Sequence, residues 1–332
     1  MSAEVRQEPI VKVENLKMYF PLSKGLVSKV YAHVKAVDDV SFEVYEGETF
    51  GLVGESGCGK TTTGKCVLRV LKPTQGKILY RGVDIAQMPP KQFQQYRRKL
   101  QMIFQDPYGS LDPRESVYTI VKEAVVADRQ PHSAAEIRDR VVELIEMVGL
   151  SKEMVTRYPH ELSGGQRQRL GIARALACNP EFIVCDEPVS ALDVSIQAQI
   201  INLFESLQQK LGLTYIFVAH DLAVVRHIAK RIGVMYLGHL VEVLDSDDLF
   251  HNSRHPYTKA LLSAVPTTDY YAEQKRKRIL LEGEVPSPIN APSGCPFHPR
   301  CRYATEACSQ VMPPLKDSGG GHLLACHNPP ED

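Results

Sequence analysis

The stretch GESGCGKTT at residues 54–62 constrains the fold more than any other part of the chain. It fits the pattern G-x-x-x-x-G-K-[ST], and it lies between an apolar run, ETFGLVG (48–54), and a helical pattern. Glycines let the backbone wrap phosphate oxygens, and successive N–H groups at a helix N-terminus attract an anion. The alternative, a glycine-rich turn with a chance lysine, does not account for these flanks. The motif therefore predicts a strand, a phosphate-binding loop and a helix in sequence.

Each residue of this loop has a predicted part in nucleotide binding. Lys60 is expected to reach the β- and γ-phosphates, and the Thr61 hydroxyl to ligate Mg²⁺. The residues predicted to surround ATP in the loop are Gly54, Glu55, Ser56, Gly57, Cys58, Gly59, Lys60, Thr61 and Thr62. The loop alone does not distinguish a kinase, a GTPase and an ATPase.

The rest of the chain alternates short apolar runs with longer helical patterns. FIVCDE (182–187) and TYIFVAHD (214–221) are predicted strands, and helical periodicity fills the segments between them. This alternation predicts an α/β domain with a largely parallel sheet. Residues 106–164 contain the helical run VVELIEMVGL and little strand signal, which predicts an inserted helical subdomain.

The composition changes after residue 265. Prolines are too frequent between 285 and 332 for a regular sheet or a helix bundle. We therefore expect a nucleotide-binding domain over residues 1–265 and a loop-rich C-terminal extension over 266–332.

Charge and hydropathy narrow the class of protein. Lys+Arg and Asp+Glu both number 39, so no overall field attracts nucleic acid or anionic lipid. The basic run KRKR (275–278) is expected to be a solvated helix face, with a partner site as the alternative. No stretch approaches the ~20 apolar residues of a membrane span, and the N-terminus MSAEVRQEPIVKVEN lacks the layout of a signal peptide. These features predict a cytosolic protein with reduced thiols.

Two further motifs carry a family resemblance. LSGGQRQR (162–169) and VCDEPVSALD (184–193), taken with the phosphate loop, resemble the ATP-binding cassette (ABC) ATPases. The resemblance implies a P-loop fold with a RecA-like parallel or mixed sheet and an inserted helical subdomain. It also implies a head-to-tail dimer, in which the signature residues of one subunit complete the ATP site of the other. Those signature residues are Leu162, Ser163, Gly164, Gly165 and Gln166.

The resemblance also implies catalytic roles for five residues. Asp186 would bind Mg²⁺, and Glu187 would orient and deprotonate the attacking water. Gln105 of QMIFQDP matches the glutamine that contacts Mg²⁺ and communicates with the transmembrane partner. His220 matches the histidine that contacts the γ-phosphate, and Asp193 matches the D-loop at the dimer interface. Acids that simply end a strand in solvent, and a structural histidine, are the alternatives.

The family places an aromatic ring against adenine after an N-L-x-x-x-aromatic pattern. N-L-K-M-Y-F puts Phe20 at that position, with Tyr19 as its rival. An aromatic side chain near a strand end is commonly part of the core, which is the alternative here.

Three segments are similar to the ATP-binding subunits of oligopeptide/dipeptide importers: YFPLSKG…VKAVDDVSF, FQDPYGSLDPR (104–114) and RHPYTKALLSAVP (254–266). The N-terminal pattern resembles the F-type subunit, which pairs with a homologous D-type subunit. The resemblance implies two membrane permeases, an external solute-binding protein and a position on the cytoplasmic face of the membrane. It also implies ATP-driven uptake of peptides, or of nickel complexes or other small solutes in some branches.

Four of the eight cysteines, Cys295, Cys301, Cys308 and Cys326, lie in the proline-rich tail. Their spacing, C-x₅-C-x₆-C-x₁₇-C, is not that of a zinc ribbon. Because the tail is short and proline-rich, we expect it to lack a core of its own, and a metal would order it. Four reduced thiols suit either Zn²⁺ or a [4Fe–4S] cluster. The family resemblance favours the [4Fe–4S] cluster.

Two alternatives for the tail thiols stay open. A histidine could replace a cysteine in a zinc site, and three lie nearby: His298, His322 and His327. The tail cysteines could also be unligated and structural. The cysteines outside the tail are interpreted as small buried hydrophobic residues: Cys58, Cys66, Cys178 and Cys185.

Two other functions compete with transport. The first is a cytosolic ABC ATPase acting on nucleic acid or ribosomes, but such proteins usually carry two cassettes and this chain has one. The chain also lacks a basic face with interleaved aromatic residues. The second is a regulatory subunit that binds ATP without turnover, which Glu187 and His220 argue against.

Overall fold

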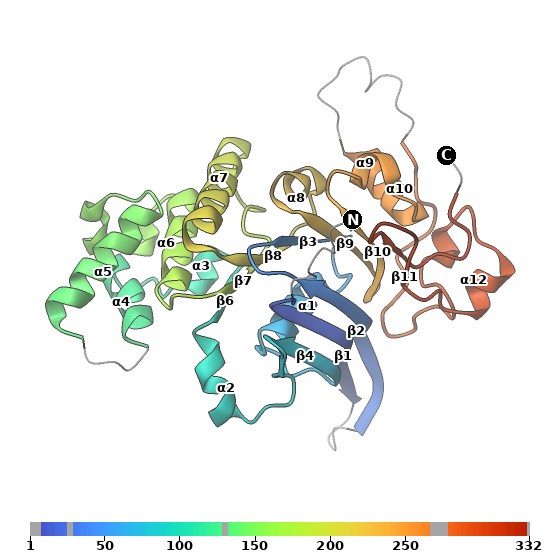
Figure 1. The fold of residues 1–332 in the computed structure, drawn as a ribbon, viewed down its shortest axis with the longest axis horizontal. Helices are drawn as coiled ribbons and strands as arrows, with labels where there is room; N and C mark the ends of the chain where they lie inside the picture. The colour runs from blue at the N-terminus through green and yellow to red at the C-terminus, as the bar shows by residue number, and fades with distance from the viewer. Residues whose placement is uncertain (1–7, 25–28, 128–131, 266–277, 331–332) are drawn as a thin grey trace, which may run out of the picture. The chain divides into compact units, whose positions relative to one another are not determined.

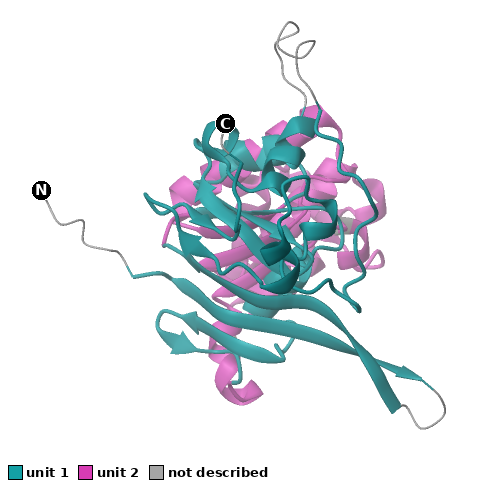
Figure 2. Ribbon diagram, turned by 90° about the vertical axis from the view of Figure 1, so that its right-hand side faces the viewer, with its two compact units in different colours: residues 1–45, 49–87, 219–332 teal, residues 46–48, 88–218 magenta. Residues whose placement is uncertain are grey.

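The computed structural model describes residues 8–24, 29–127, 132–265 and 278–330 (Figure 1). The chain divides into two compact units, coloured separately in Figure 2. Unit 1 comprises residues 1–45, 49–87 and 219–332, and unit 2 comprises residues 46–48 and 88–218. Residues 1–7, Gly25, Pro266 and residues 275–277 of the basic run, all used in the sequence predictions, lie outside the described residues.

An antiparallel sheet, which the sequence analysis did not predict, lies at the N-terminal end of unit 1 (Figures 1 and 2). Its strand order is β2-β1-β4-β5. The strands are β1 (Val11–Lys24), β2 (Lys29–Val44), β4 (Gln75–Tyr80) and β5 (Val83–Asp84). Near its start β1 buries Val11, Val13 and Leu16, so one face of the sheet packs on the core.

The second sheet of unit 1 contains the strand that leads into the phosphate loop. Its order is β11-β12-β10-β9-β3, with β3 parallel to β9 and the other pairs antiparallel. The strands are β3 (Thr49–Val53), β9 (Arg231–Tyr236), β10 (His239–Asp245), β11 (Lys316–Asp317) and β12 (Leu323–Leu324). β3 is buried along its whole length, which explains its continuous apolar sequence.

Short helices complete unit 1. They are α1 (Lys60–Val67), α8 (Leu222–Ile228), α9 (Leu249–Asn252), α10 (Pro256–Ala264), α12 (Glu306–Gln310) and the 3₁₀ helix η3 (His298–Arg300). Helix α8 lies directly against β3, because a Cβ on Gly51 would come within 2.2 Å of Val225 Cγ1.

Unit 2 contains the other predicted strands. β6 (Leu100–Ile103), β7 (Phe182–Asp186) and β8 (Thr214–Val218) run parallel in the order β8-β7-β6. Helix α2 (Pro90–Arg97) precedes β6, and helix α7 (Val194–Leu211) connects β7 to β8. Phe204 of α7 packs edge-on against Tyr215 and Phe217 of β8, with ring centroids 5.6 and 5.8 Å apart. The parallel arrangement expected from the alternating pattern is confirmed.

A group of helices in unit 2 lies between β6 and β7 in the chain, and all but the last fall within residues 106–164, where an insertion is predicted (Figure 1). They are α3 (Pro107–Ser110), α4 (Val117–Val126), α5 (Ala134–Met147), η1 (Lys152–Thr156), η2 (Pro159–Glu161) and α6 (Gly164–Leu176). Ser133 begins α5 with a capping box closed by Glu136, and the apolar side of α5 buries Val141, Leu144 and Ile145. No helix in the described ranges is both long and apolar enough to cross a membrane.

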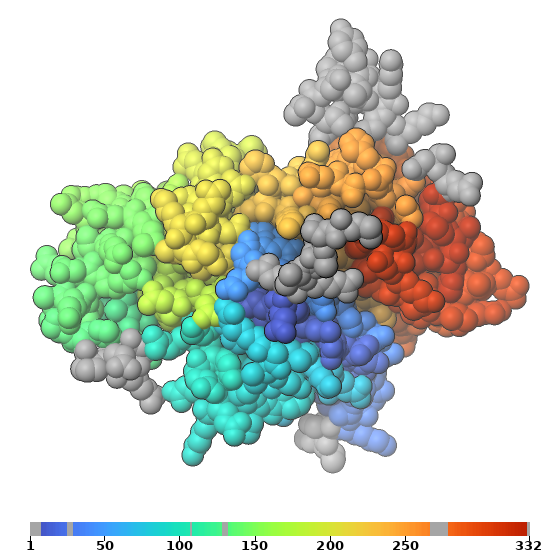
Figure 3. All heavy atoms as spheres, viewed as in Figure 1, coloured from blue at the N-terminus to red at the C-terminus, as the bar shows by residue number. Residues whose placement is uncertain are grey.

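The C-terminal extension is loop-rich, as its prolines suggest, but its core is shared with the rest of unit 1. Phe297 is 1 % exposed, and its ring centroid lies 5.2 Å from that of Tyr236 and 5.4 Å from that of Tyr257. Leu324 of β12 pairs with Glu242 of β10. In Figure 3 the red atoms of the extension pack next to the orange atoms of α9 and α10. The extension is therefore ordered by packing on β9, β10 and α10.

Candidate functional site

The phosphate loop of unit 1 has a backbone that only glycine can adopt at several positions. Gly54, Gly57 and Gly59 have φ values of 150°, 78° and 106°. A Cβ on Gly54 would lie 2.2 Å from Met235 O, and one on Gly59 would lie 2.2 Å from Ala36 O. The loop is thus held tightly against β9 and β2, with Ser56 and Gly57 exposed at its tip.

Lys60, the first residue of α1, lies under this loop. It is 4 % exposed, and its ammonium donates hydrogen bonds to the carbonyls of Gly54 at 2.8 Å and Glu55 at 3.0 Å. Carbonyl oxygens satisfy the donors without cancelling the charge, so the lysine retains positive charge for an anion. Thr61 and Thr62 follow in the first turn of α1 and are half-buried. These residues fit a nucleotide phosphate group, as the sequence predicts.

Two predicted catalytic residues of unit 2 are hydrogen-bonded to each other. Gln105 follows β6 and Glu187 follows β7, and because these parallel strands are neighbours, both residues emerge at the same sheet edge. Gln105 Nε2 donates to Glu187 Oε2 at 3.0 Å. Asp186, the last residue of β7, is 3 % exposed. An amide and two carboxylates at one edge are the donor types that suit Mg²⁺ and a water nucleophile.

Glu187 has a strained backbone. Its φ is 44°, in the left-handed region that glycine favours, and its N–H donates to Val218 O at 3.0 Å. Such conformations cost about 1–3 kcal/mol and are retained where the surrounding structure fixes them. In this conformation the Glu187 side chain accepts the hydrogen bond from Gln105.

The signature segment forms the N-terminus of α6, also in unit 2. Ser163 is the N-cap; its hydroxyl accepts from Gln166 N–H, while Gln166 Oε1 accepts from Ser163 N–H at 2.9 Å. A Cβ on Gly165 would lie 2.6 Å from Ile196 Cγ2, and one on Gly164 would lie 3.4 Å from a methyl of Leu192. Leu162, just before the cap, is 3 % exposed. Gly165 therefore lets α6 approach the start of α7 closely, whereas a side chain at Gly164 would make only an ordinary contact.

Asp193 and His220 are both exposed. Asp193 is the N-cap of α7, and its carbonyl accepts from the N–H groups of Ile196 and Gln197, whereas its side chain makes no capping bond. The next residue, Val194, is 82 % exposed. His220, in unit 1, lies just before the N-cap of α8.

Of the two aromatic candidates for adenine, Tyr19 is held within unit 1. Its hydroxyl donates to Asp38 Oδ1 at 2.6 Å, and Lys35 Nζ lies 5.7 Å from its ring centroid. Burial and the hydrogen bond to Asp38 raise the pKa of Tyr19. Phe20 is half-buried and, as the next residue of β1, points to the other face of the strand. This arrangement leaves Phe20 as the better candidate.

The four tail cysteines are free thiols in one neighbourhood of unit 1. Cys295 N–H donates to Cys308 O at 2.8 Å. Burial raises the pKa of Cys326, and together with the charges of Cys295, Cys301 and Cys308 it brings that pKa to about 11. Thiols are the right donors for a [4Fe–4S] cluster or for Zn²⁺. However, within the described part of the chain no three His, Cys, Asp or Glu side chains converge as a metal-binding group, so the predicted cluster is not confirmed.

The three tail histidines are bonded elsewhere. His298 Nδ1 lies 2.9 Å from Cys295 O, and His327 Nε2 lies 2.9 Å from Val311 O. His322 Nε2 lies 2.8 Å from the buried carboxylate of Glu242. These contacts disfavour a zinc site in which a histidine replaces a cysteine.

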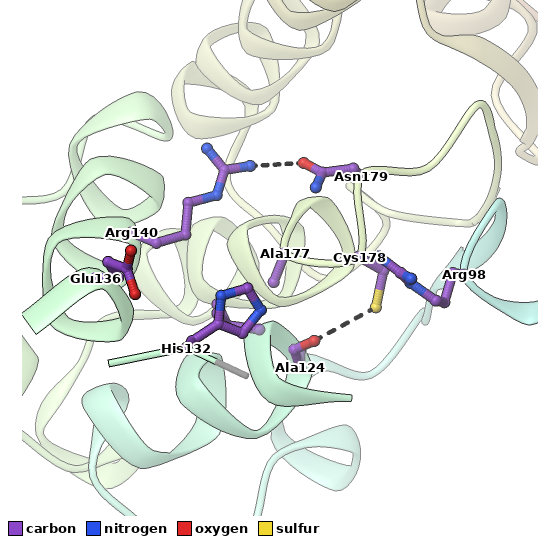
Figure 4. Close-up of a pocket in the computed structure, with 9 residues that line it drawn as sticks. Arg98, Ala124, His132, Glu136, Arg140, Ala177, Cys178 and Asn179 are labelled. Carbon is purple, nitrogen blue, oxygen red and sulfur yellow. Dashed lines mark hydrogen bonds between the residues drawn. The ribbon is translucent and has the colours of Figure 1, made fainter. Parts of the chain in front are cut away.

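Among the other cysteines, the prediction of burial is wrong for Cys178. Cys58, Cys66 and Cys185 are buried, but Cys178 is half-exposed and lines a cavity of about 310 Å³ in unit 2 (Figure 4). Its thiol points toward Ala124 O at 3.8 Å. Asn179, which follows the C-cap of α6 at Ala177, also lines this cavity.

Glu55 of the phosphate loop has partners that no sequence pattern indicated. The guanidinium of Arg300 donates to Glu55 Oε2 at 2.9 Å and to Glu55 Oε1 at 3.2 Å. Glu55 N–H donates to the hydroxyl of Tyr257 at 2.8 Å. The predicted cysteine segment contains Arg300, but no local pattern links it to a residue 245 positions away.

Comparison with known families settles which group of proteins carries this site. A family model described as "ABC transporter" matches residues 37–190, and one described as "Oligopeptide/dipeptide transporter, C-terminal region" matches residues 241–308. The oligopeptide transport ATP-binding protein AppF of Bacillus subtilis is 51 % identical over 322 residues, covering 97 % of this chain and 98 % of the relative. This chain belongs to the ABC transporter family. Within it, the matched C-terminal region is that of the oligopeptide/dipeptide branch. The enzyme class is that of the ABC ATPases.

Other members of the family are similar to this chain in sequence and in structure. The oligopeptide transport ATP-binding protein OppF of Salmonella typhimurium is 48 % identical over 329 residues, covering 98 % of each chain. Among solved structures, the dimeric post-hydrolysis state of the ATP-binding cassette MJ0796 bound to ADP and Pi aligns with a TM-score of 0.63 and 29 % identity. It covers 71 % of this chain and 98 % of that one. The predicted ABC-type P-loop fold is confirmed.

Proposed function

We propose that this chain is the ATP-hydrolysing subunit of a membrane importer and that its ATPase cycle drives uptake of peptides. The observation that carries the proposal is its identity of about half with the peptide-transport ATP-binding protein AppF across 97 % of the chain, tail included. A shared catalytic cassette alone would show only ATP hydrolysis. The matched C-terminal region narrows the cargo to that of the oligopeptide/dipeptide branch.

The chemistry follows from the residues at the two sites. Lys60 is the group that would neutralise the β- and γ-phosphates, and the backbone N–H groups of Gly57 and Gly59 would donate to the same oxygens. Thr61, Gln105 and Asp186 would hold Mg²⁺, which when bound supplies positive charge to the phosphates and helps withdraw electrons from the bond that breaks.

Glu187 is the proposed general base. Its carboxylate would accept a proton from the attacking water, and the hydrogen bond from Gln105 would hold that carboxylate in place. His220 would bind the γ-phosphate and respond to its loss. Because Gln105 is hydrogen-bonded to Glu187, a movement of Gln105 would shift the Glu187 carboxylate. This supports a role for Gln105 in communication between the ATP site and a membrane partner.

The signature residues are proposed to complete a partner's ATP site. Ser163 and Gly164 are exposed at the N-terminus of α6, and the tight packing of Gly165 on Ile196 joins this helix end to the D-loop at Asp193. The dimeric state of the related cassette MJ0796 supports this arrangement. We propose a homologous D-type subunit as the partner, with Phe20 stacking on adenine. The chain alone would therefore hydrolyse ATP slowly.

The remaining partners follow from the same proposal. They are two transmembrane permeases and, indirectly, an extracellular solute-binding protein, with this subunit bound peripherally at the cytoplasmic face of the membrane. Residues 1–265 would form the nucleotide-binding domain, with the helical subdomain at 106–164, and residues 266–332 the C-terminal extension.

We also propose a [4Fe–4S] cluster on Cys295, Cys301, Cys308 and Cys326, with Zn²⁺ as the alternative. The proposal is supported by four free thiols whose charges act on one another. The thiols would have to draw closer, because the described residues hold no converged metal-binding group. No step of ATP hydrolysis depends on this centre.

The test is to express the chain with its candidate D-type subunit and two permeases and to purify the assembly. We expect the four to co-purify and to hydrolyse ATP, and Glu187→Gln to bind ATP but lose most of the turnover. Glu146→Gln, the same change on the exposed face of α5, is the matched control and should hydrolyse ATP normally. A chain that purifies alone and hydrolyses ATP at the full rate would refute the shared site. Nickel-stimulated rather than peptide-stimulated hydrolysis would reassign the cargo.

A further inference from the structure

The phosphate loop contains a carboxylate, and the C-terminal extension supplies its counter-charge. Arg300 contacts Glu55 through two nitrogens, at 2.9 and 3.2 Å, in a fork-to-fork pair. The Arg300 side chain is only 7 % exposed, and that of Glu55 is 27 % exposed. Because the pair is largely removed from water, its charges are screened less than those of a surface salt bridge.

A rigid aromatic group fixes the position of Arg300. Arg300 ends η3, where its N–H donates to Phe297 O at 3.0 Å, and Nη1 lies 3.4 Å from the hydroxyl of Tyr236. The rings of Tyr236, Tyr257 and Phe297 contact one another, with centroids 4.8 to 5.4 Å apart. Tyr257 also accepts the N–H of Glu55. The guanidinium and the loop backbone are thus held by one cluster.

A carboxylate without a counter-charge would weaken phosphate binding in this loop, because its negative charge repels the phosphates. The carbonyl of Glu55 is one of the two that hold the Lys60 ammonium, so the placement of Glu55 also affects the residue meant for the phosphates. We propose that Arg300 is a positioning residue of the nucleotide site. It neutralises Glu55 and holds its side chain aside, so that the C-terminal extension completes the phosphate loop without touching ATP.

The test measures ATP affinity of the full chain by fluorescence titration. Arg300→Met should raise the Kd for ATP about tenfold, the effect expected when a partly screened charge is released beside the phosphates. The double variant Arg300→Met/Glu55→Gln should bind ATP as tightly as Glu55→Gln alone, and several-fold more tightly than Arg300→Met. Arg302→Met, an exposed neighbour, is the control and should bind as the wild type does.

Two readouts separate this role from a purely structural one. The loss in Arg300→Met should shrink as salt rises, because screening weakens repulsion between Glu55 and the phosphates. If that variant fails to fold, Arg300→Lys, which keeps the charge but not the fork, should show an intermediate Kd. An unchanged Kd in Arg300→Met, or a double variant no better than Arg300→Met, would overturn the inference.

The inference rests on the proposed nucleotide site, and the two can fail separately. Lys60→Ala tests the site itself. If that change leaves ATP affinity intact, the site is wrong. If it abolishes binding while the Arg300 series changes nothing, only the inference about Arg300 is wrong.

Discussion

A buried histidine in unit 1 makes the stability of the protein depend on pH. His255 is 1 % exposed, and its Nδ1 accepts the Tyr257 N–H at 3.1 Å as the N-cap of α10. Burial lowers the pKa of His255 from 6.5 to about 4, although the nearby carboxylate of Glu242 works against this shift. The folded ring is therefore neutral at pH values where the unfolded chain is protonated.

The sign follows from proton uptake by the unfolded chain. Between pH 6.5 and about pH 4, His255 is protonated in the unfolded state but neutral in the folded state. The free energy of unfolding therefore falls as the pH falls toward 4. This lowering of the His255 pKa corresponds to a loss of about 2–3 kcal/mol in the free energy of unfolding between pH 7 and about pH 4.5. Glu242, whose pKa is lowered despite burial by bonds from His322 and Arg254 N–H, adds its own loss only at lower pH.

The assay is urea unfolding of the wild-type chain and of His255→Asn at pH 7 and pH 4.5. Asparagine can accept the same N–H as a cap but does not titrate. Between pH 7 and pH 4.5, the free energy of unfolding of the variant should fall by about 2–3 kcal/mol less than that of the wild type. His239, whose pKa burial also lowers, contributes equally to both chains and cancels in the comparison. Identical pH dependence in the two chains would refute the assignment.

The remaining predictions concern the loop, the signature helix and the tail. Lys60→Ala should weaken ATP binding at least about tenfold in a titration, because it removes a charged donor from the phosphates; unchanged affinity would count against the site. Gly165→Ala should destabilise the chain by about 1–3 kcal/mol in urea unfolding, because its Cβ would lie 2.6 Å from Ile196 Cγ2. Gly171→Ala, in the same helix with open space around it, should instead stabilise by about 0.5–1 kcal/mol, and equal effects would show that packing is not the cause. Cys295→Ser should remove protein-bound iron and sulfide from anaerobically purified protein, whereas stoichiometric zinc in the wild type would replace the cluster assignment.

The parts of the fold that sequence could predict are those that local chemistry determines. The order of strand, loop and helix at Lys60 follows from continuous burial of β3 and from glycines that alone can adopt the loop backbone. Likewise, Ser163 and Gln166 indicate a capped helix start, and the structure closes that capping box. In both cases the residues that interact are close in sequence.

The parts that sequence did not predict depend on distant contacts. The ion pair of Glu55 and Arg300 joins residues 245 positions apart, and the sequence around neither residue indicates the pairing. The extension has too few apolar residues for a core of its own, and Phe297 instead packs against Tyr236 and Tyr257. No periodicity in the tail sequence indicates this contact. The antiparallel pairing of β1 with β4 similarly crosses β2, β3 and α1 in the chain.

Transport into reconstituted vesicles tests whether ATP hydrolysis at Glu187 drives peptide uptake. The assembled importer, with its binding protein and a labelled peptide, should accumulate the peptide only when ATP is supplied on the side of this subunit. Replacing this subunit with its Glu187→Gln variant should reduce the uptake rate at least about tenfold, because a general base contributes that much or more. Uptake at the wild-type rate with Glu187→Gln, or uptake without ATP, would contradict the account.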